Sequence, residues 1–171
     1  MVRIIGTLLL LAGSSGMAYS YCHEQNERLK ILKNMREIFI RIKNEIEYLK
    51  ASIPEICFSL GEKNISFNKV FTAIYEELEL NNGCSFNEIW QRHFTASLKN
   101  MPLKETEKEM IKSFPDSLVY RESKGQADGM EKYINEVSKY VGEIETVIKN
   151  KNKVMMCVGV MAGMITTVIL L

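Results

Sequence analysis

Two uncharged segments near the ends of the chain constrain its fold most. Ile4–Tyr21 and Val154–Leu171 are each eighteen residues long and contain no charged side chain. As α-helices they would span about 27 Å, close to the roughly 30 Å hydrocarbon core of a bilayer. We therefore expect a transmembrane helix at residues 1–21 and another at 154–171. Residues 22–153 would then form a domain outside the bilayer.

The first apolar segment also fits a second interpretation. Arg3, the apolar residues after it and the small residues of Gly16–Ala18 are also typical of a secretory signal peptide, which would be removed from the mature protein. Two observations favour a retained helix: the apolar stretch continues past Ala18, and Tyr19 and Tyr21 suit a membrane interface. We favour retention and keep cleavage as the alternative.

The distribution of positive charge predicts how the chain would be oriented. Only Arg3 precedes the first apolar segment, whereas lysines and arginines flank the inner ends of both segments, Arg28 and Lys153 among them. Loops rich in Lys and Arg generally remain in the cytoplasm. The sequence therefore predicts that residues 22–153 are cytoplasmic and that both apolar ends reach the opposite side.

Apolar residues between these segments recur at alternating steps of three and four, which is the spacing of a helical packing seam. No stretch alternates with the period of two that strands require. We therefore expect an all-α bundle with two long antiparallel helices, the first covering about residues 22–52. The two seams are Leu32, Met35, Phe39, Ile42, Ile46, Leu49 and Ile53, and Met130, Tyr133, Val137, Tyr140, Ile144 and Val147.

Shorter helices are predicted between the two long ones. Pro54 suits the first turn of a helix, and Ser66 is a favourable N-cap for the next. Ser85–Glu88 has the pattern of a capping box, and a further helix covers about residues 104–114. The aromatic residues of this region are expected in the core rather than in a binding platform; they are Phe67, Phe71, Phe86, Trp90 and Phe94.

Composition and motifs argue against several classes of function. With 22 Lys and Arg against 21 Asp and Glu, the chain lacks the basic excess typical of nucleic-acid binding. The cysteines form no C-x-x-C pair, so Cys57 and Cys84 are expected to be small apolar residues of helices. His23 and His93 have no recognisable catalytic partner. We therefore expect no enzymatic activity, no cofactor and no metal.

Small residues in both apolar segments suggest how the predicted membrane helices would pack. Gly159 and Gly163 lie four residues apart, on one helical face, and Ala12 and Gly16 repeat that spacing in the first segment. Small residues at this spacing let two helices approach closely in a bilayer. Glycine is also simply tolerated in membrane helices, so both interpretations stay open.

Several short motifs match one known family. Glu45-Ile46-x-Tyr48 is followed by Pro54, Trp90 stands near the start of a helix, and Gly125-Gln126 precedes the last long helix. With the glycines Gly159 and Gly163, these motifs make the chain resemble stage III sporulation protein AB of endospore-forming bacteria. The chain departs from the family at residues 113–120, where Pro115 and Val119 stand in place of glycines.

This resemblance implies both a fold and a role. The family is similar to the cytoplasmic helical domain of the platform protein in type II secretion and type IV pilus machines. It implies a membrane component of the channel between mother cell and forespore, located in the mother-cell membrane. Its partners would be a secretion-type ATPase, ring-forming membrane proteins and membrane lipid, and homo-oligomerisation stays open.

Two further expectations concern the partner surface and the alternatives. Glu62 and Lys63 are the candidate ATPase-facing positions, because they are far in sequence from both apolar segments. A different class of protein is also compatible with the sequence: a membrane-tethered helical signalling or scaffolding adaptor unrelated to secretion.

Overall fold

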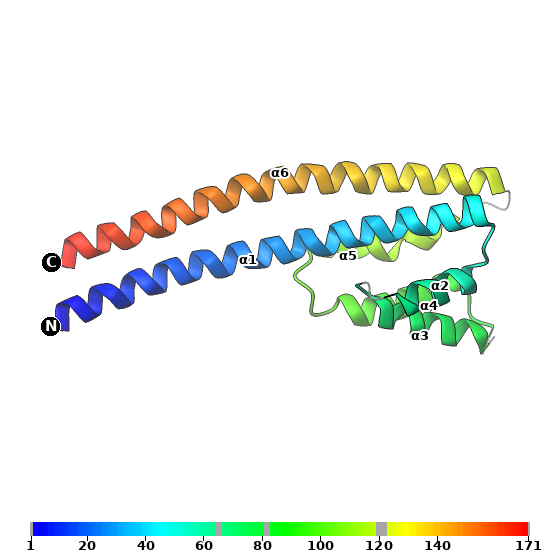
Figure 1. The fold of residues 1–171 in the computed structure, drawn as a ribbon, viewed down its shortest axis with the longest axis horizontal. Coiled ribbons are helices and arrows are strands. Elements are labelled where there is room, and N and C mark those ends of the chain that lie inside the picture. Colours follow the sequence, from blue (N-terminus) through cyan, green and yellow to red (C-terminus); the bar gives the residue numbers. More distant parts are fainter. Residues whose placement is uncertain (1, 64–65, 81–82, 119–122, 171) are drawn as a thin grey trace. The chain divides into compact units, whose positions relative to one another are not determined.

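The computed structural model describes residues 2–63, 66–80, 83–118 and 123–170; for 2–5, 7–11, 14, 123–128, 160 and 166–170 it describes the backbone alone. Every regular element among these residues is helical (Figure 1), which confirms the all-α class. The elements are α1 (Val2–Asn44), a π-helical turn η1 (Glu45–Leu49), α2 (Ile53–Glu62), α3 (Asn68–Glu79), α4 (Phe86–Leu98), α5 (Glu105–Lys112), a 3₁₀ helix η2 (Phe114–Leu118) and α6 (Ser123–Leu170).

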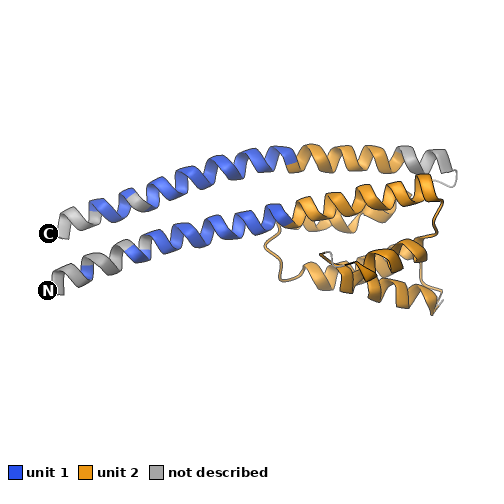
Figure 2. Cartoon of the chain, viewed as in Figure 1, with its two compact units in different colours: residues 1–30, 142–171 blue, residues 31–141 orange. Residues whose placement is uncertain are grey.

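The chain divides into two compact units, shown in Figure 2. Unit 1 contains residues 1–30 and 142–171, and unit 2 contains residues 31–141. Helices α1 and α6 contribute residues to both units. The predicted division at residues 21 and 153 concerned the membrane boundary and stays a prediction.

Unit 2 has an aromatic core centred on Trp90. This side chain is fully buried, and its Nε1 donates a hydrogen bond to the carbonyl oxygen of Ile111 at 3.1 Å. Its ring centroid lies 4.2 Å from that of Phe94 and 5.2 Å from that of Phe114. Because the indole N–H is paired, the large apolar ring is buried without an unsatisfied donor. The core position predicted for Phe71, Trp90 and Phe94 is confirmed, whereas Phe67 and Phe86 are half-buried.

In unit 2 the end of α1 packs against the beginning of α6. Lys43 Nζ lies 3.1 Å from Glu131 Oε2, and the Phe39 and Tyr133 rings meet edge to face at 5.5 Å. The later residue of α1 thus contacts the earlier residue of α6, so the two segments run antiparallel. The hydrogen bond from Lys43 to Glu131 raises the pKa of the Lys43 ammonium.

The first predicted seam is only partly correct. Leu32, Met35, Phe39 and Ile42 are buried, but Leu49 is 72% exposed. The π-helical turn η1 rotates its side chains out of the α-helical register, and Lys50 then ends it in a left-handed conformation with φ 53°. The first helix therefore does not reach Ser52, and Ile53 belongs to α2.

The second seam is confirmed at Met130 and Val137, whereas its alternate positions are shifted by one residue. The buried residues of α6 in unit 2 are Met130, Ile134, Val137 and Val141. Tyr133 and Tyr140, which were predicted in the seam, are half-buried because their hydroxyls face α5. Val147, predicted in the same seam, is 49% exposed.

Tyr133 and Tyr140 connect α6 to α5. The Tyr133 hydroxyl donates to the carbonyl oxygen of Met110, and the Tyr140 hydroxyl donates to Oε1 of the fully buried Glu107 at 3.0 Å. Glu107 also accepts a hydrogen bond from the backbone N–H of Lys104, which begins α5. Burial raises the pKa of the Tyr133 hydroxyl. These polar contacts satisfy groups that would be costly to bury alone.

Two predicted helix starts had different outcomes. The Ser85 capping box is confirmed: the Glu88 N–H donates to Ser85 Oγ, and the Ser85 N–H donates to a Glu88 carboxylate oxygen at 2.8 Å. The Ser66 cap is wrong. Helix α3 begins at Asn68 after Phe67, whose φ is 70°, and the Ser66 hydroxyl instead accepts a hydrogen bond from Asn34 at 2.8 Å.

Helices α2 and α3 approach closely at Gly61. A Cβ at this position would lie 2.7 Å from Thr72 Oγ1 and 3.2 Å from the Thr72 backbone nitrogen. Cys57 of α2 is buried as predicted, and burial raises the pKa of its thiol to about 12. Cys84 is not helical: it is exposed and follows Gly83, whose φ of 74° favours glycine.

Unit 1 contains a pair of helical segments held partly by polar contacts. Cys22 Sγ donates to the carbonyl oxygen of Asn152 at 3.7 Å, and Asn152 Nδ2 donates to Asn26 Oδ1 at 3.0 Å. Ala18, Cys22, Leu29 and Ile148 are its buried apolar side chains. A polar pair between helices restricts how they slide past each other.

Many other apolar side chains of unit 1 are exposed. Met17 is 78% exposed and Ile165 58%. Within the described residues, no helix combines the length and the apolar character that a membrane crossing requires. The predicted spans at 1–21 and 154–171 include side chains outside that description, those of residues 2–5, 7–11 and 166–170 among them. The exposed set also includes Tyr19, Val154, Met156, Val158, Met161 and Met164.

Candidate functional site

The candidate site is a groove of about 440 Å³ in unit 2. Four separate segments of the chain form its wall: the turn η1, the start of α2, the start of α4 and the 3₁₀ helix η2. Most of the surface in the groove is apolar. Its lining residues are Ile46, Ala51, Ser52, Ile53, Ser85, Phe86, Asn87, Pro115 and Leu118.

Local sequence signals place these segments. Lys50 adopts a positive φ and redirects the chain after η1, and Ser52 then begins α2 with Pro54 in its first turn. Ser85 begins α4 in the same way. Phe114 is fully buried in the aromatic core and anchors the start of η2, so Pro115 and Leu118 are held at the wall.

Three carboxylates border the groove, each hydrogen-bonded to a lining residue. Glu55 accepts from the Ser52 backbone N–H at 2.7 Å, and Glu88 accepts from that of Ser85 at 2.8 Å. Asp116 Oδ1 accepts from Asn87 Nδ2 at 3.0 Å. The hydrogen bonds from Ser52 and Ser85 hold the pKa values of Glu55 and Glu88 below their usual range. Glu55 and Glu88 are therefore ionised at neutral pH.

The Glu45-Ile46-x-Tyr48 motif lies beside this groove. Ile46 lines it, whereas Tyr48 is 74% exposed. Glu45 lies 3.4 Å from Arg41 Nε and 4.0 Å from Lys63 Nζ. The motif therefore contributes one wall residue, one exposed ring and one ion-pair network.

The predicted ATPase-facing pair lies at the end of α2. Glu62 is exposed, and Lys63 donates to Ser59 Oγ at 3.1 Å besides approaching Glu45. Trp90, a motif position, is a core residue and offers no surface for a partner. The Lys63–Glu45 contact joins the end of α2 to the turn η1.

The remaining predicted positions lie in α6 and unit 1. Gly125 and Gln126 belong to the backbone of α6, but their side-chain environment lies outside the description. Gly163 is buried and Gly159 half-buried, whereas Ala12 and Gly16 are exposed. Among the described residues of the first apolar segment, Ala18 is buried.

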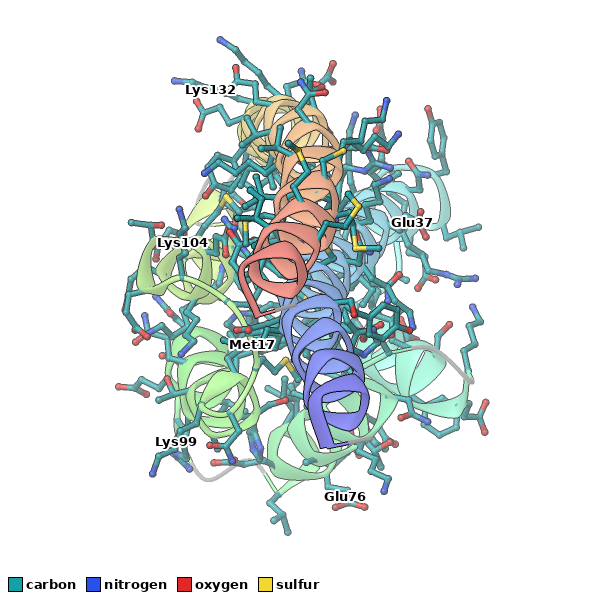
Figure 3. The ribbon with its side chains drawn as sticks, turned by 90° about the vertical axis from the view of Figure 1, so that its left-hand side faces the viewer. Met17, Glu37, Glu76, Lys99, Lys104 and Lys132 are labelled. Atoms are coloured by element: carbon teal, nitrogen blue, oxygen red, sulfur yellow. The ribbon has the colours of Figure 1, made fainter. Side chains whose placement is uncertain are left out.

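Several titratable groups outside the groove form surface ion pairs. Among the described residues, no group of three or more His, Cys, Asp or Glu side chains is placed to hold a metal. Figure 3 shows Glu37, Glu76, Lys99 and Lys104 of unit 2 pointing outward. His93 Nε2 lies 2.7 Å from Glu77 Oε2, and Arg92 also pairs with Glu77. The contact between His93 and Glu77 could not be predicted from the sequence, because α3 and α4 bring together residues sixteen positions apart.

The described residues of unit 2 form a helical bundle with an apolar groove bordered by carboxylates. The family model described as stage III sporulation protein AB matches residues 3–171, so the chain belongs to that family and the predicted resemblance is confirmed. Membership implies a role in sporulation. No curated protein and no solved structure matches the chain.

Proposed function

We propose that this protein is a non-enzymatic platform component of a secretion-like channel between mother cell and forespore. It would be held in the mother-cell membrane by helices at residues 1–21 and 154–171. Its central domain would couple a cytoplasmic secretion-type ATPase to ring-forming membrane proteins. The family match over nearly the whole chain carries the sporulation part of this proposal.

The exposed apolar surface of unit 1 supports membrane attachment. Val158 is 54% exposed and Met161 57% on a helical segment that has no charged residue after Lys153. Water-soluble proteins seldom expose contiguous apolar surface of this kind, which usually marks contact with lipid or another protein. Lipid would cover it at no cost to the fold.

Three lysines directly before the second apolar segment support a cytoplasmic position for the central domain; they are Lys149, Lys151 and Lys153. The ATPase partner rests on the resemblance of this family to secretion platform proteins. A fold-level likeness alone is a weak guide to function, so the partner needs a direct test.

The test uses the full chain reconstituted in lipid nanodiscs and the purified ATPase of the same sporulation channel. Binding is measured by biolayer interferometry, and ATP hydrolysis is measured with and without the nanodiscs. We expect saturable binding or stimulated hydrolysis, and neither with empty nanodiscs. If the full chain neither binds nor stimulates the ATPase, the platform function is wrong and the adaptor alternative is favoured.

The candidate positions at the end of α2 are tested in the same assay. Glu62→Lys reverses an exposed charge without removing a described contact, and Lys63→Glu also breaks the approach to Glu45. Weaker binding of both variants would place the ATPase at this end of α2. Unchanged binding would exclude these two positions.

A further inference from the structure

The groove between η1, α2, α4 and η2 has features that select a particular kind of partner. Ile46, Ile53 and Phe86 supply apolar wall, and Ser52, Ser85 and Asn87 connect that wall to the carboxylates of Glu55, Glu88 and Asp116. Arg92 offsets part of the charge of Glu88, so Glu55 and Asp116 supply most of the negative border. An apolar floor with an anionic border complements an apolar segment that carries Lys or Arg.

Helix N-termini often attract anions, but the two that open onto this groove are already satisfied. In α2 and α4 the glutamate of each capping box accepts the N-cap backbone N–H and places its own negative charge there. A phosphate or an acidic peptide would therefore meet repulsion from Glu55 and Glu88. This disfavours an anionic occupant.

Asn87 adds a second observation inside the groove. Its Nδ2 donates to Asp116, but its Oδ1 is shielded from solvent and makes no hydrogen bond within the described residues. A shielded acceptor without a donor costs free energy. A segment that brings an N–H into the groove would offset this cost once the Asn87 amide turns toward it.

We propose that this groove binds a lysine- or arginine-bearing apolar segment of the ATPase partner. The inference rests on the proposed function, because that function supplies the partner. The apolar part of the segment would cover Ile53 and Phe86, while its cation would lie near Asp116. The exposed Tyr48, next to the lining residue Ile46 in η1, would widen the contact at one edge.

The experiment compares variants of the full chain in lipid nanodiscs, with the purified ATPase as probe and biolayer interferometry as readout. Ala51→Trp fills the groove, and Asp116→Lys reverses its exposed carboxylate. Glu76→Lys is the matched control, because Glu76 is an exposed glutamate of α3 that does not line the groove. Circular dichroism melting curves show whether each variant is folded, and Asp116→Asn provides a milder change should Asp116→Lys fail to fold.

We expect Ala51→Trp and Asp116→Lys to weaken binding by roughly tenfold or more, and Glu76→Lys to leave it within about twofold. Binding of the wild-type chain should also weaken as NaCl rises from 50 to 500 mM, because salt screens the carboxylates. Folded groove variants that bind like the wild type would overturn the groove assignment and leave the platform function intact. No binding by the wild-type chain would overturn both.

Discussion

The two units of this protein differ in how much of their apolar surface they bury. Unit 2 buries Phe39, Phe71, Trp90, Phe94 and Phe114 completely and satisfies the indole N–H among them. Unit 1 leaves Met17 and Val158 more than half exposed and buries small residues such as Ala18 and Cys22. The first pattern is that of a core formed in water. The second leaves apolar surface uncovered by the described residues, and in the membrane proposal lipid would cover it.

The strongest way to break this comparison is to remove the centre of the unit 2 core. Trp90→Ala deletes a fully buried side chain and leaves the Ile111 carbonyl oxygen without its donor. We expect the free energy of unfolding to fall by about 3–5 kcal/mol, measured by urea unfolding with circular dichroism. Leu80→Ala, at a position 69% exposed, is the control and should change it by less than about 0.5 kcal/mol. Similar effects of both variants would refute the core assignment.

A second test concerns the close approach of α2 and α3. Gly61→Ala places a Cβ 2.7 Å from Thr72 Oγ1 and 3.2 Å from the Thr72 backbone nitrogen, so we expect a loss of about 1–3 kcal/mol. Gly142→Ala is the matched helical control in unit 1, where nothing lies within 4 Å. It should be neutral or stabilise by up to about 1 kcal/mol. Thermal unfolding by circular dichroism distinguishes the two, and a stable Gly61→Ala variant would contradict the close packing.

A third test addresses the buried polar contacts between α5 and α6. Tyr140→Phe removes a hydrogen bond to the buried Glu107, and we expect a loss of about 1–3 kcal/mol because one carboxylate oxygen then loses its donor. Tyr133→Phe removes a bond to a backbone carbonyl and should cost about 1 kcal/mol. Urea unfolding followed by the fluorescence of Trp90 measures both. An unchanged Tyr140→Phe variant would show that this contact does not stabilise unit 2.

The smallest expected effect is a pH dependence from the helix caps. The pKa values of Glu55 and Glu88 are lowered in the folded state by hydrogen bonds from Ser52 and Ser85. Their contribution is therefore present above the ordinary glutamate pKa and is lost as the pH falls through the folded value. Unfolding experiments between pH 7 and pH 3 should show this loss. It should be smaller in Glu88→Gln, and an unchanged pH profile in that variant would argue against the cap.

The sequence predicted those features of the fold that depend on residues close together in the chain. The Ser85 capping box and the start of α2 near Pro54 form as expected, because their partners lie within four residues. The Ser66 cap was wrong: the Ser66 hydroxyl accepts a hydrogen bond from Asn34, which is thirty-two residues away in the chain. Tyr133 and Tyr140 were assigned to the seam because periodicity alone cannot show on which side α5 packs.

The candidate groove could not be predicted, because four distant segments form its wall. The π-helical turn η1 could not be predicted from the spacing of apolar residues. It exposes Leu49 to solvent, although that spacing places Leu49 in the seam. Family motifs signalled the region through Ile46 and Pro54, but not the role of each residue. Gly125 and Gln126 remain motif positions whose side-chain surroundings lie outside the described residues.

The central claim is that residues 1–21 and 154–171 lie in lipid while residues 22–153 lie in water, and two native cysteines, one in each part, test it directly. Cys84 in unit 2 and Cys157 in unit 1 are both exposed on the chain itself. Maleimides react with the thiolate, which forms in water and not in hydrocarbon. In intact native membranes, a membrane-permeable maleimide should label Cys84 readily and leave Cys157 unlabelled until the chain is denatured. Labelling is read by mass spectrometry, and the variants Cys84→Ser and Cys157→Ser assign each signal to its cysteine. Equal labelling of both cysteines before denaturation would contradict the account.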